Sequence, residues 1–368
     1  TIRERKKSSP NNSYTNKLIK DKALRTSKLH EEIEELIEAA ENKSNTIHEA
    51  SDVIYHLMVY LEANDIKIEE TSNLENFKDL GYDSPYIFGN TYFGRNNYIT
   101  YYPGNLPLII SVSHGGDLTP QEIPDRSYGV LVTDSNTIEL ALSLRNYFIS
   151  NHGDSPYFII NNLKRTKLDA NRDIIEAAQG NIYAERAFNE FHHYIRSARD
   201  DILEDNPLAL LLDIHGHGVN PDGFNDLRTW IGYLITSSQL DKSDDYIDTE
   251  IPKNEISLRA ILNKSEYSLS HLIRGEFSLG SLMEKKNITA LPSQQNLGPN
   301  GSRYFSGGYI TNIYGTDINY DISSIQLEFP YDGIRSSIEE INSFTVIFLN
   351  VLDNFFKIHL NIDLLKND

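Results

Sequence analysis

The chain has 368 residues and a formal net charge of −19, with 53 Asp and Glu against 34 Lys and Arg. This acidic balance argues against non-specific binding to nucleic acid, which needs a basic surface to neutralise phosphates. No run of about 20 apolar residues occurs, so we predict no membrane span and no membrane partner. Because cysteine is absent, any metal must be held by His and carboxylates. We therefore expect a cytoplasmic chain with room for one small and one larger domain.

Helical periodicity runs through residues 17–29, 30–43 and 46–64. The second and third of these segments carry acidic residues three or four positions apart, which share a helix face. Facing carboxylates repel one another unless a hard cation lies between them, and oxygen-only ligands favour Mg²⁺ or Mn²⁺. The candidate magnesium ligands are Glu31, Glu32, Glu35, Glu49 and Asp52. On spacing alone, a solvated acidic face is the favoured interpretation of these residues.

Four stretches occur in an order that is typical of a known family: R-E-R-K at 3–6, S-Y-T-N-K-L at 13–18, K-L-H-E-E-I-E-E-L-I-E-A-A at 28–40 and H-E-A-S-D-V-I-Y-H-L-M-V-Y-L at 48–61. Residues 3–70 thereby resemble phosphoribosyl-ATP pyrophosphohydrolase, an all-α nucleotide pyrophosphatase of histidine biosynthesis. The resemblance implies that the acidic residues hold Mg²⁺ on a triphosphate and that the basic N-terminal arm meets the phosphates.

Charge supports that resemblance. Residues 1–30 contain nine Lys or Arg and two acids, whereas residues 31–70 contain two Lys and twelve acids. Such asymmetry suits joint binding of a polyphosphate by cations and a metal. Compared with the family, the module over 1–70 is shortened at both ends, and about 70 residues bury too little surface to be robust alone. We therefore expect it to form a homodimer or to dock on the rest of the chain.

The segment 71–105 is rich in Gly, Asn, Tyr and Pro and predicts a linker or irregular entry segment. Beyond it, short apolar runs at 107–113, 157–161, 208–214, 231–236 and 322–329 predict buried strands. Helical stretches near 134–150, 181–203 and 336–357 lie between or after them. The alternation predicts an α/β domain over 106–368, with a largely parallel mixed sheet flanked by helices and ligands at the strand ends.

Three of the predicted strands end in residues that can bind a metal or move a proton. His114 follows the run at 107–113, His215 follows 208–214, and Glu328 lies near the end of 322–329. A catalytic zinc site needs three nitrogen or oxygen ligands and an open position for water. A single His at a strand end is more often structural, but three such groups together make a metal site about as well supported as a structural role.

Further motifs in this region follow the order of a second known family: V-S-H-G-G at 112–116, T-D-S-N-T-I-E-L-A at 133–141, K-R-T-K-L-D-A-N-R-D at 164–173, L-L-D-I-H-G-H-G at 211–218, F-S-G-G-Y-I-T at 305–311 and I-Q-L-E at 325–328. Residues 107–335 thereby resemble the N-formylglutamate amidohydrolase family, whose fold is similar to zinc carboxypeptidases. The resemblance implies zinc and hydrolysis of an N-acyl amino acid. The family's named substrate, N-formyl-L-glutamate, gives formate and glutamate.

Carried over by position, the resemblance makes His114 and His215 zinc ligands. The third ligand is either Glu122, in the loop after His114, or Asp134, which opens the next helix and is slightly favoured. Glu328 matches the general base, with a salt bridge to Arg335 or another basic group as the structural alternative.

The same resemblance implies a clamp for a substrate carboxylate, formed by Arg165, Asn171 and Arg172. Residues expected to orient the ligand imidazoles are His217, Asp213 and Asp117. Two other functions stay open. One is a Mg²⁺-dependent nucleotide pyrophosphohydrolase with a diverged C-terminal domain, and the other is a non-catalytic binding module that recognises an acidic ligand on the zinc fold.

Overall fold

The computed structural model describes residues 13–42, 45–64, 85–218 and 225–365. The chain forms two compact units, residues 1–82 and residues 83–368. Within the described ranges, no helix is both long enough and apolar enough to cross a membrane.

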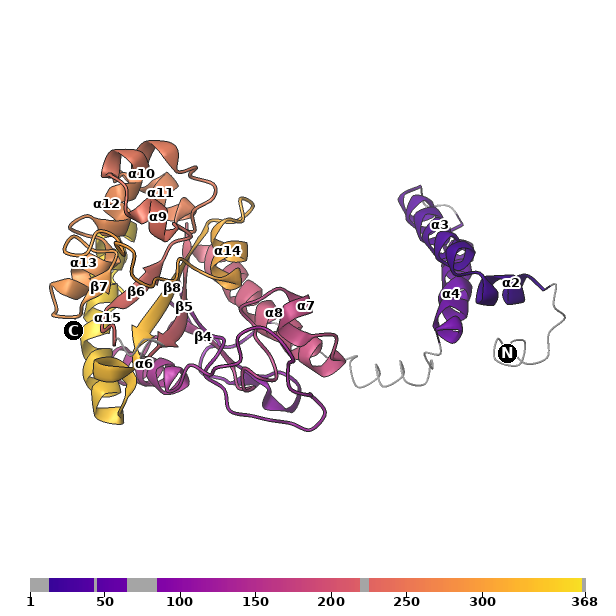
Figure 1. Ribbon diagram of the computed structural model, residues 1–368, viewed down its shortest axis with the longest axis horizontal. Coiled ribbons are helices and arrows are strands. Elements are labelled where there is room, and N and C mark those ends of the chain that lie inside the picture. Colours follow the sequence, from indigo (N-terminus) through magenta and orange to yellow (C-terminus); the bar gives the residue numbers. More distant parts are fainter. Residues whose placement is uncertain (1–12, 43–44, 65–84, 219–224, 366–368) are drawn as a thin grey trace. The chain divides into compact units, whose positions relative to one another are not determined.

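The first unit is helical, as the sequence predicts, with α2 (Tyr14–Lys20), α3 (Lys22–Glu41) and α4 (Thr46–Ala63). Asp21 separates α2 from α3, and its side chain caps α3 by accepting a hydrogen bond from the backbone N–H of Leu24 at 3.0 Å. The helices α3 and α4 pack against each other as a hairpin (Figure 1). Leu18 and Val59 are fully buried between the helices. The predicted basic arm at 3–6 lies outside the described residues.

An eight-stranded mixed sheet with the order β1-β2-β4-β3-β5-β8-β6-β7 forms the centre of the second unit. Parallel pairing joins β3 to both β4 and β5, β5 to β8, and β6 to β7, whereas the other three pairs are antiparallel. The predicted α/β fold class is confirmed. The strands are β1 (Tyr92–Phe93), β2 (Ile99–Tyr102), β3 (Leu108–Val112), β4 (Tyr157–Asn161), β5 (Ala209–His217), β6 (Thr229–Gly232), β7 (Ala290–Leu291) and β8 (Ile322–Pro330).

Helices cover both faces of this sheet (Figure 1). Their bounds are α6 (Thr137–His152), α7 (Ile174–Ala178), α8 (Ile182–Asp205), α9 (Ser237–Leu240), α10 (Asp244–Glu250), α11 (Arg259–Lys264), α12 (Leu269–Arg274), α13 (Leu279–Glu284), α14 (Tyr309–Gly315) and α15 (Ile338–Leu360), with the short helical turns η2 (Arg95–Asn97) and η3 (Tyr331–Arg335). The helices α6 and α15 pack together, and α8 and α14 contact the strands from the other face.

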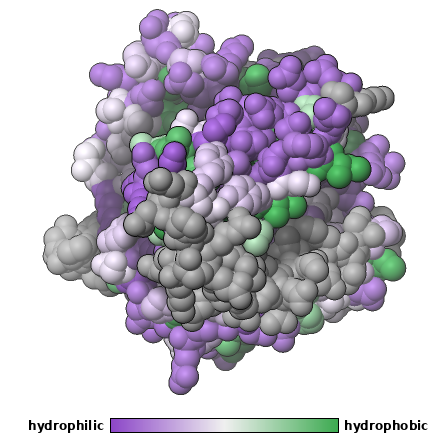
Figure 2. Space-filling model, turned by 90° about the vertical axis from the view of Figure 1, so that its right-hand side faces the viewer, coloured by the Kyte–Doolittle hydropathy of each residue, from purple (hydrophilic) through white to green (hydrophobic). Residues whose placement is uncertain are grey.

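The central strands are apolar on both faces because both faces are covered. In β3, Leu108 and Ile110 belong to the core shared with α6 and α15, whereas Ile109 belongs to the core shared with α8. This alternation follows from the two-residue period of a strand. The coloured surface in Figure 2 is mostly hydrophilic, with small hydrophobic patches, in keeping with the acidic composition of the chain.

The structure differs from the expected linker over 71–105. Residues 65–84 lie outside the described part, but β2 pairs antiparallel with β4, and Ile99 and Tyr101 are buried. The sequence does not reveal β2, which lies between β1 and β4, because its pairing with β4 comes from a partner about 60 residues away rather than from local alternation.

Candidate active site

Three neighbouring strands bring the predicted catalytic residues together. β3, β5 and β8 are adjacent and parallel, so their C-terminal ends meet at one edge of the sheet. His114 lies two residues beyond β3, and His215 is paired in register with Glu328 across β5 and β8. All three side chains are buried, at 6% exposure or less.

Asp134 completes a cluster with the two histidines. Its Oδ2 atom lies 3.4 Å from Nδ1 of His114 and 3.2 Å from Nδ1 of His215. The ligand atoms of these three buried residues all lie within 4.8 Å of one another. The backbone N–H of Asp134 donates to the carbonyl of His114 at 3.0 Å, which fixes the loop before α6 against the end of β3.

A carboxylate contacts the Nε2 atom of each imidazole. Nε2 of His114 lies 2.6 Å from Oδ1 of Asp169, and Nε2 of His215 lies 2.5 Å from Oδ2 of Asp213. Such contacts leave Nδ1 of each ring directed at Asp134, and Nδ1 of His114 is buried without a hydrogen-bond partner. Two imidazole nitrogens and one carboxylate oxygen, with the rings oriented by acids behind them, fit the ligand set of a catalytic zinc site.

The electrostatics of the cluster suit a cation. Burial alone would raise the pKa of Asp134, but the neighbouring imidazoles of His114 and His215 hold it well below its usual value. Burial alone would lower the pKa of His215, yet Asp213 and Asp134 raise it well above the ordinary value. A metal ion at Nδ1 would replace the proton that these carboxylates otherwise favour.

Glu122 is not brought to this cluster. Its carboxylate forms an ion pair with the guanidinium of Arg95 in η2 and accepts a hydrogen bond from the hydroxyl of Tyr98. These contacts outweigh partial burial and lower the pKa of Glu122 to about 2. The geometry therefore favours Asp134, of the two acids predicted, as the third ligand.

Glu328 lies beside the cluster and lines the same cavity, which has a volume of about 510 Å³. Gln326 donates a hydrogen bond to its Oε1 at 2.9 Å. Burial raises the pKa of Glu328, His215 opposes this shift and Asp134 adds to it. Within the described residues, no ion pair joins Glu328 to Arg335 or to another basic side chain, and Arg335 instead donates to backbone carbonyls.

Arg172 lines the cavity with a side chain that is 32% exposed. Its Nη1 donates to the carbonyl of Asn171 at 2.7 Å, and its Nε lies 3.3 Å from Glu176. Arg165 and Asn171 also line the cavity, but both are buried and hydrogen-bonded to other parts of the protein. Nε of Arg165 donates to Asp169 at 2.9 Å, and Oδ1 of Asn171 accepts from the backbone of Ile310 at 2.8 Å.

Of the three residues expected to orient the imidazoles, Asp213 contacts Nε2 of His215. His217 stacks on Trp230 with ring centroids 3.9 Å apart and bonds to the carbonyl of Arg228, whereas Asp117 is exposed. Asp169, which was not among the three, contacts Nε2 of His114. Sequence reasoning missed this acid although it lies in the K-R-T-K-L-D-A-N-R-D motif, because its contact with His114 spans 55 positions.

A second, more exposed cluster lies in the first unit, where α3 and α4 bring Glu32, Glu35 and Glu49 together. Partial desolvation and the carboxylates of Glu32 and Glu49 raise the pKa of Glu35, which is the expected response to crowded negative charge. Glu31 instead pairs with Lys28 at 2.6 Å.

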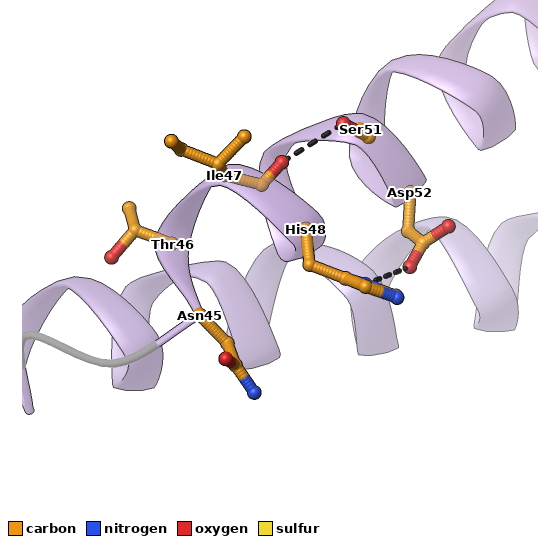
Figure 3. Close-up of a pocket in the computed structure, with 6 residues that line it drawn as sticks. All are labelled: Asn45, Thr46, Ile47, His48, Ser51 and Asp52. Carbon is orange, nitrogen blue, oxygen red and sulfur yellow. Dashed lines mark hydrogen bonds and ion pairs between the residues drawn. The ribbon is translucent and has the colours of Figure 1, made fainter.

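Asp52 belongs to a neighbouring cluster on α4, and the sequence prediction did not include one member of that cluster, His48. Nδ1 of His48 lies 2.9 Å from Oδ2 of Asp52, and Glu49 completes a set of three potential ligands. Figure 3 shows the His48 and Asp52 side chains on the same side of the helix, with Ser51 turned back to the carbonyl of Ile47. Four of the five acids predicted for Mg²⁺ therefore lie in two overlapping groups that share Glu49.

The comparisons with known proteins concern each unit separately. Residues 1–74 match the family model described as phosphoribosyl-ATP pyrophosphohydrolase. A phosphoribosyl-ATP pyrophosphatase of Clostridium novyi is 42% identical over 77 residues, which cover 20% of this chain and 68% of that protein. The histidine biosynthesis trifunctional protein of Saccharomyces cerevisiae is 38% identical over 79 residues, which are 22% of this chain. The match spans about a tenth (10%) of that protein's length.

Solved structures match most of the chain at low sequence identity. An N-formylglutamate amidohydrolase from Ralstonia eutropha covers 72% of this chain and 99% of its own, with a TM-score of 0.45 and 10% identity. A gene product from Agrobacterium tumefaciens covers 69% of this chain and 94% of its own, with a TM-score of 0.39 and 12% identity. The chemistry of the second unit is therefore inferred from its own residues.

Proposed function

The chain belongs, through residues 1–74, to the phosphoribosyl-ATP pyrophosphohydrolase family, and we propose that it carries two hydrolytic sites, one in each unit. The second unit offers the better-formed site. We assign it as a zinc-dependent amidohydrolase that cleaves an N-acyl amino acid such as N-formylglutamate.

One observation carries this assignment. His114 and His215 direct Nδ1 at Asp134 while Asp169 and Asp213 hold their Nε2 atoms, and the cluster lines a cavity that also contains Glu328. A purely structural cluster would have no need of an open cavity beside a buried carboxylate. When bound there, Zn²⁺ would supply polarisation of the acyl carbonyl and a water pKa of about 7.

Glu328 acts as the proton carrier in this mechanism. It accepts a proton from the attacking water and delivers it to the nitrogen that leaves, so that the amide C–N bond breaks and a carboxylate and an amine form. Its raised pKa suits the first step, because a carboxylate with a higher pKa is a stronger proton acceptor. The hydrogen bond from Gln326 holds the carboxylate in the cavity.

Arg172 is the residue best placed to bind the carboxylate of the substrate, because its guanidinium borders the cavity and is partly accessible. A planar guanidinium grips a carboxylate through two parallel hydrogen bonds. Arg165 is the poorer candidate because it is engaged with Asp169 and Val132. We therefore propose a small substrate that carries a free carboxylate.

Metal content tests the proposal. The full chain, stripped with a chelator and reloaded with Zn²⁺ in excess Mg²⁺, is expected to retain one zinc in the second unit. His114→Ala and His215→Ala should each lose it, because two remaining ligands hold zinc poorly. His271→Ala, at an exposed position on α12, should keep it. Stoichiometric zinc in either ligand variant would contradict the assignment.

For the first unit we propose Mg²⁺-dependent hydrolysis of a phosphoribosyl nucleotide triphosphate. Family membership favours this activity, and so does the convergence of Glu32, Glu35 and Glu49 from two helices. Oxygen ligands of this kind suit Mg²⁺, which binds through a few carboxylates together with substrate phosphates.

The first unit also presents apolar side chains to solvent. Exposed apolar residues at helical spacing are Ile33 and Ile37 on α3 and Ile54, Leu57 and Met58 on α4. Only Leu18, Ala39 and Val59 are buried hydrophobic residues in its described part, which is a small core. We propose that a second copy of the unit covers this face. Ile37→Glu with Ile54→Glu should convert the chain from dimer to monomer in sedimentation equilibrium, and an unmodified chain that is already monomeric would contradict the proposal.

A further inference from the structure

Arg335 lies at the end of η3, where its side chain is buried at 3% exposure. Its guanidinium donates to three backbone carbonyls from three different segments. Nε donates to Phe329 at 3.2 Å, Nη2 donates to His217 at 2.7 Å, and Nη1 donates to Ser135. One planar group thus joins the loop before α6, the end of β5 and the end of β8.

Each of these carbonyls belongs to a residue one or two positions after a residue of the proposed active site. Ser135 follows Asp134, Phe329 follows Glu328, and His217 is two residues after His215. We propose that Arg335 is a positioning residue that holds two metal ligands, Asp134 and His215, and the base, Glu328, in one fixed arrangement. This inference rests on the proposed function of the second unit.

Gly216 provides independent support because it makes room for the guanidinium. A Cβ atom added at Gly216 would collide with the guanidinium atoms of Arg335. The backbone N–H of Gly216 donates to Oδ2 of Asp134 at 3.2 Å. The residue between His215 and His217 therefore contacts both the third ligand and the guanidinium, which requires close approach of the backbone.

The loop that carries Asp134 also donates a hydrogen bond to η3. Nδ2 of Asn136 donates to the carbonyl of Arg335 at 2.7 Å, so the loop that carries Asp134 is bound to η3 at two points. Lysine cannot replace this arrangement, because one ammonium at the end of a flexible chain lacks the planar fork that reaches three carbonyls. Loss of the fork would loosen the spacing of the ligands while each ligand side chain remains present.

Arg335→Lys tests the inference, and Arg274→Lys is its matched control. Arg274 is buried to 4% exposure and donates to the carbonyls of Leu240, Lys242 and Leu297, away from the cavity. Both substitutions remove a buried guanidinium group and should lower the melting temperature of the protein. Zn²⁺ affinity is measured by competition with a chromophoric chelator, and the visible spectrum of the Co²⁺-loaded chain reports coordination geometry.

We expect Arg335→Lys to lose about 10- to 100-fold in Zn²⁺ affinity, the usual effect of removing support behind metal ligands, and to change the Co²⁺ spectrum. Arg274→Lys should bind Zn²⁺ within about twofold of the unmodified chain, with the same Co²⁺ spectrum. Equal affinity in Arg335→Lys and the unmodified chain would overturn the inference, as would an equal loss in Arg274→Lys. If the unmodified chain binds no Zn²⁺, the metal centre itself is wrong and the inference fails with it.

Gly216→Ala provides a second test should Arg335→Lys fail to fold. It keeps Arg335 and every proposed ligand but places a methyl group where the guanidinium lies. It should also lower Zn²⁺ affinity by about 10-fold or more. Affinity equal to that of the unmodified chain would show that the position of the guanidinium does not govern the site.

Discussion

The carboxylate of Asp169 fixes the imidazole of His114, with Oδ1 2.6 Å from Nε2 and the opposite nitrogen directed at Asp134. Because Asp169 is fully buried, its contact with Nε2 is protected from water. The acid therefore decides which nitrogen of His114 carries the proton and which is available to a metal.

Asp169→Asn should weaken Zn²⁺ binding by about 10- to 100-fold, because an amide no longer favours a proton on Nε2. The measurement is a competition titration of the metal-free chain. Asp226→Asn provides the control, since Asp226 is also buried but pairs with Arg228 and Trp230 rather than with a ligand. Unchanged affinity in Asp169→Asn, or an equal loss in Asp226→Asn, would contradict the role assigned to Asp169.

Glu122 gives a prediction on the pH dependence of stability. Its folded pKa of about 2 lies below the ordinary 4.5, so the folded state binds fewer protons than the unfolded state in that range. The ion pair with Arg95 therefore stabilises the fold fully above about pH 4.5 and loses its effect as the pH falls towards 2. Since the Glu122 side chain is 28% exposed, solvent screening limits the contribution to about 1–2 kcal/mol.

Glu122→Gln should lower the free energy of unfolding by this amount at pH 7, measured by urea denaturation. The difference between the variant and the unmodified chain should shrink as the pH is lowered from 4.5 towards 2. Zn²⁺ content should stay unchanged, because Glu122 lies outside the cluster. Loss of zinc in this variant would restore Glu122 as a ligand and displace Asp134.

The acidic clusters of the first unit predict a ligand-dependent gain in stability. Mg²⁺ with a nucleoside triphosphate, each at millimolar concentration, should raise the melting temperature of the unit by mass action. A ligand at 100 times its dissociation constant raises the free energy of unfolding by about 2.7 kcal/mol. Glu49→Gln with Asp52→Asn should remove the gain, since Glu49 belongs to both groups. Glu34→Gln, on the exposed surface of α3, should retain it. If the unmodified chain shows no shift, the acids are a solvated face.

Local patterns in the sequence predicted those helices and strands whose own residues show a clear hydrophobic pattern. Continuous apolar runs gave β3, β4, β5 and β8 because these strands are buried on both faces, and helical periodicity gave α6, α8 and α15. The short helices between Ser237 and Glu284 were not predicted, because runs of four to seven residues are too short to show a period.

The site residues, too, were predicted where the sequence carries a signal and missed where their role depends on distant contacts. His114, His215 and Glu328 were predicted from strand ends together with the resemblance to a known family, since parallel strands end at one edge of the sheet. The choice between Asp134 and Glu122 could not be made from the sequence, because it depends on where Arg95 lies in three dimensions. Asp169 and Arg335 act through contacts with segments 55 to 200 positions away, which a single sequence does not reveal.

The most direct test of the proposed amidohydrolase is the release of formate or free amine from a panel of N-formyl and N-acetyl amino acids. The panel includes N-formylglutamate, and the zinc-loaded chain is compared with Glu328→Gln at equal zinc content. Glutamine keeps the size and hydrogen bonding of Glu328 but cannot accept the proton, so turnover should fall by about 10²-fold or more while zinc stays bound. If both proteins are fully loaded with zinc and equally inactive on every substrate, the second unit is a binding module and not an amidohydrolase.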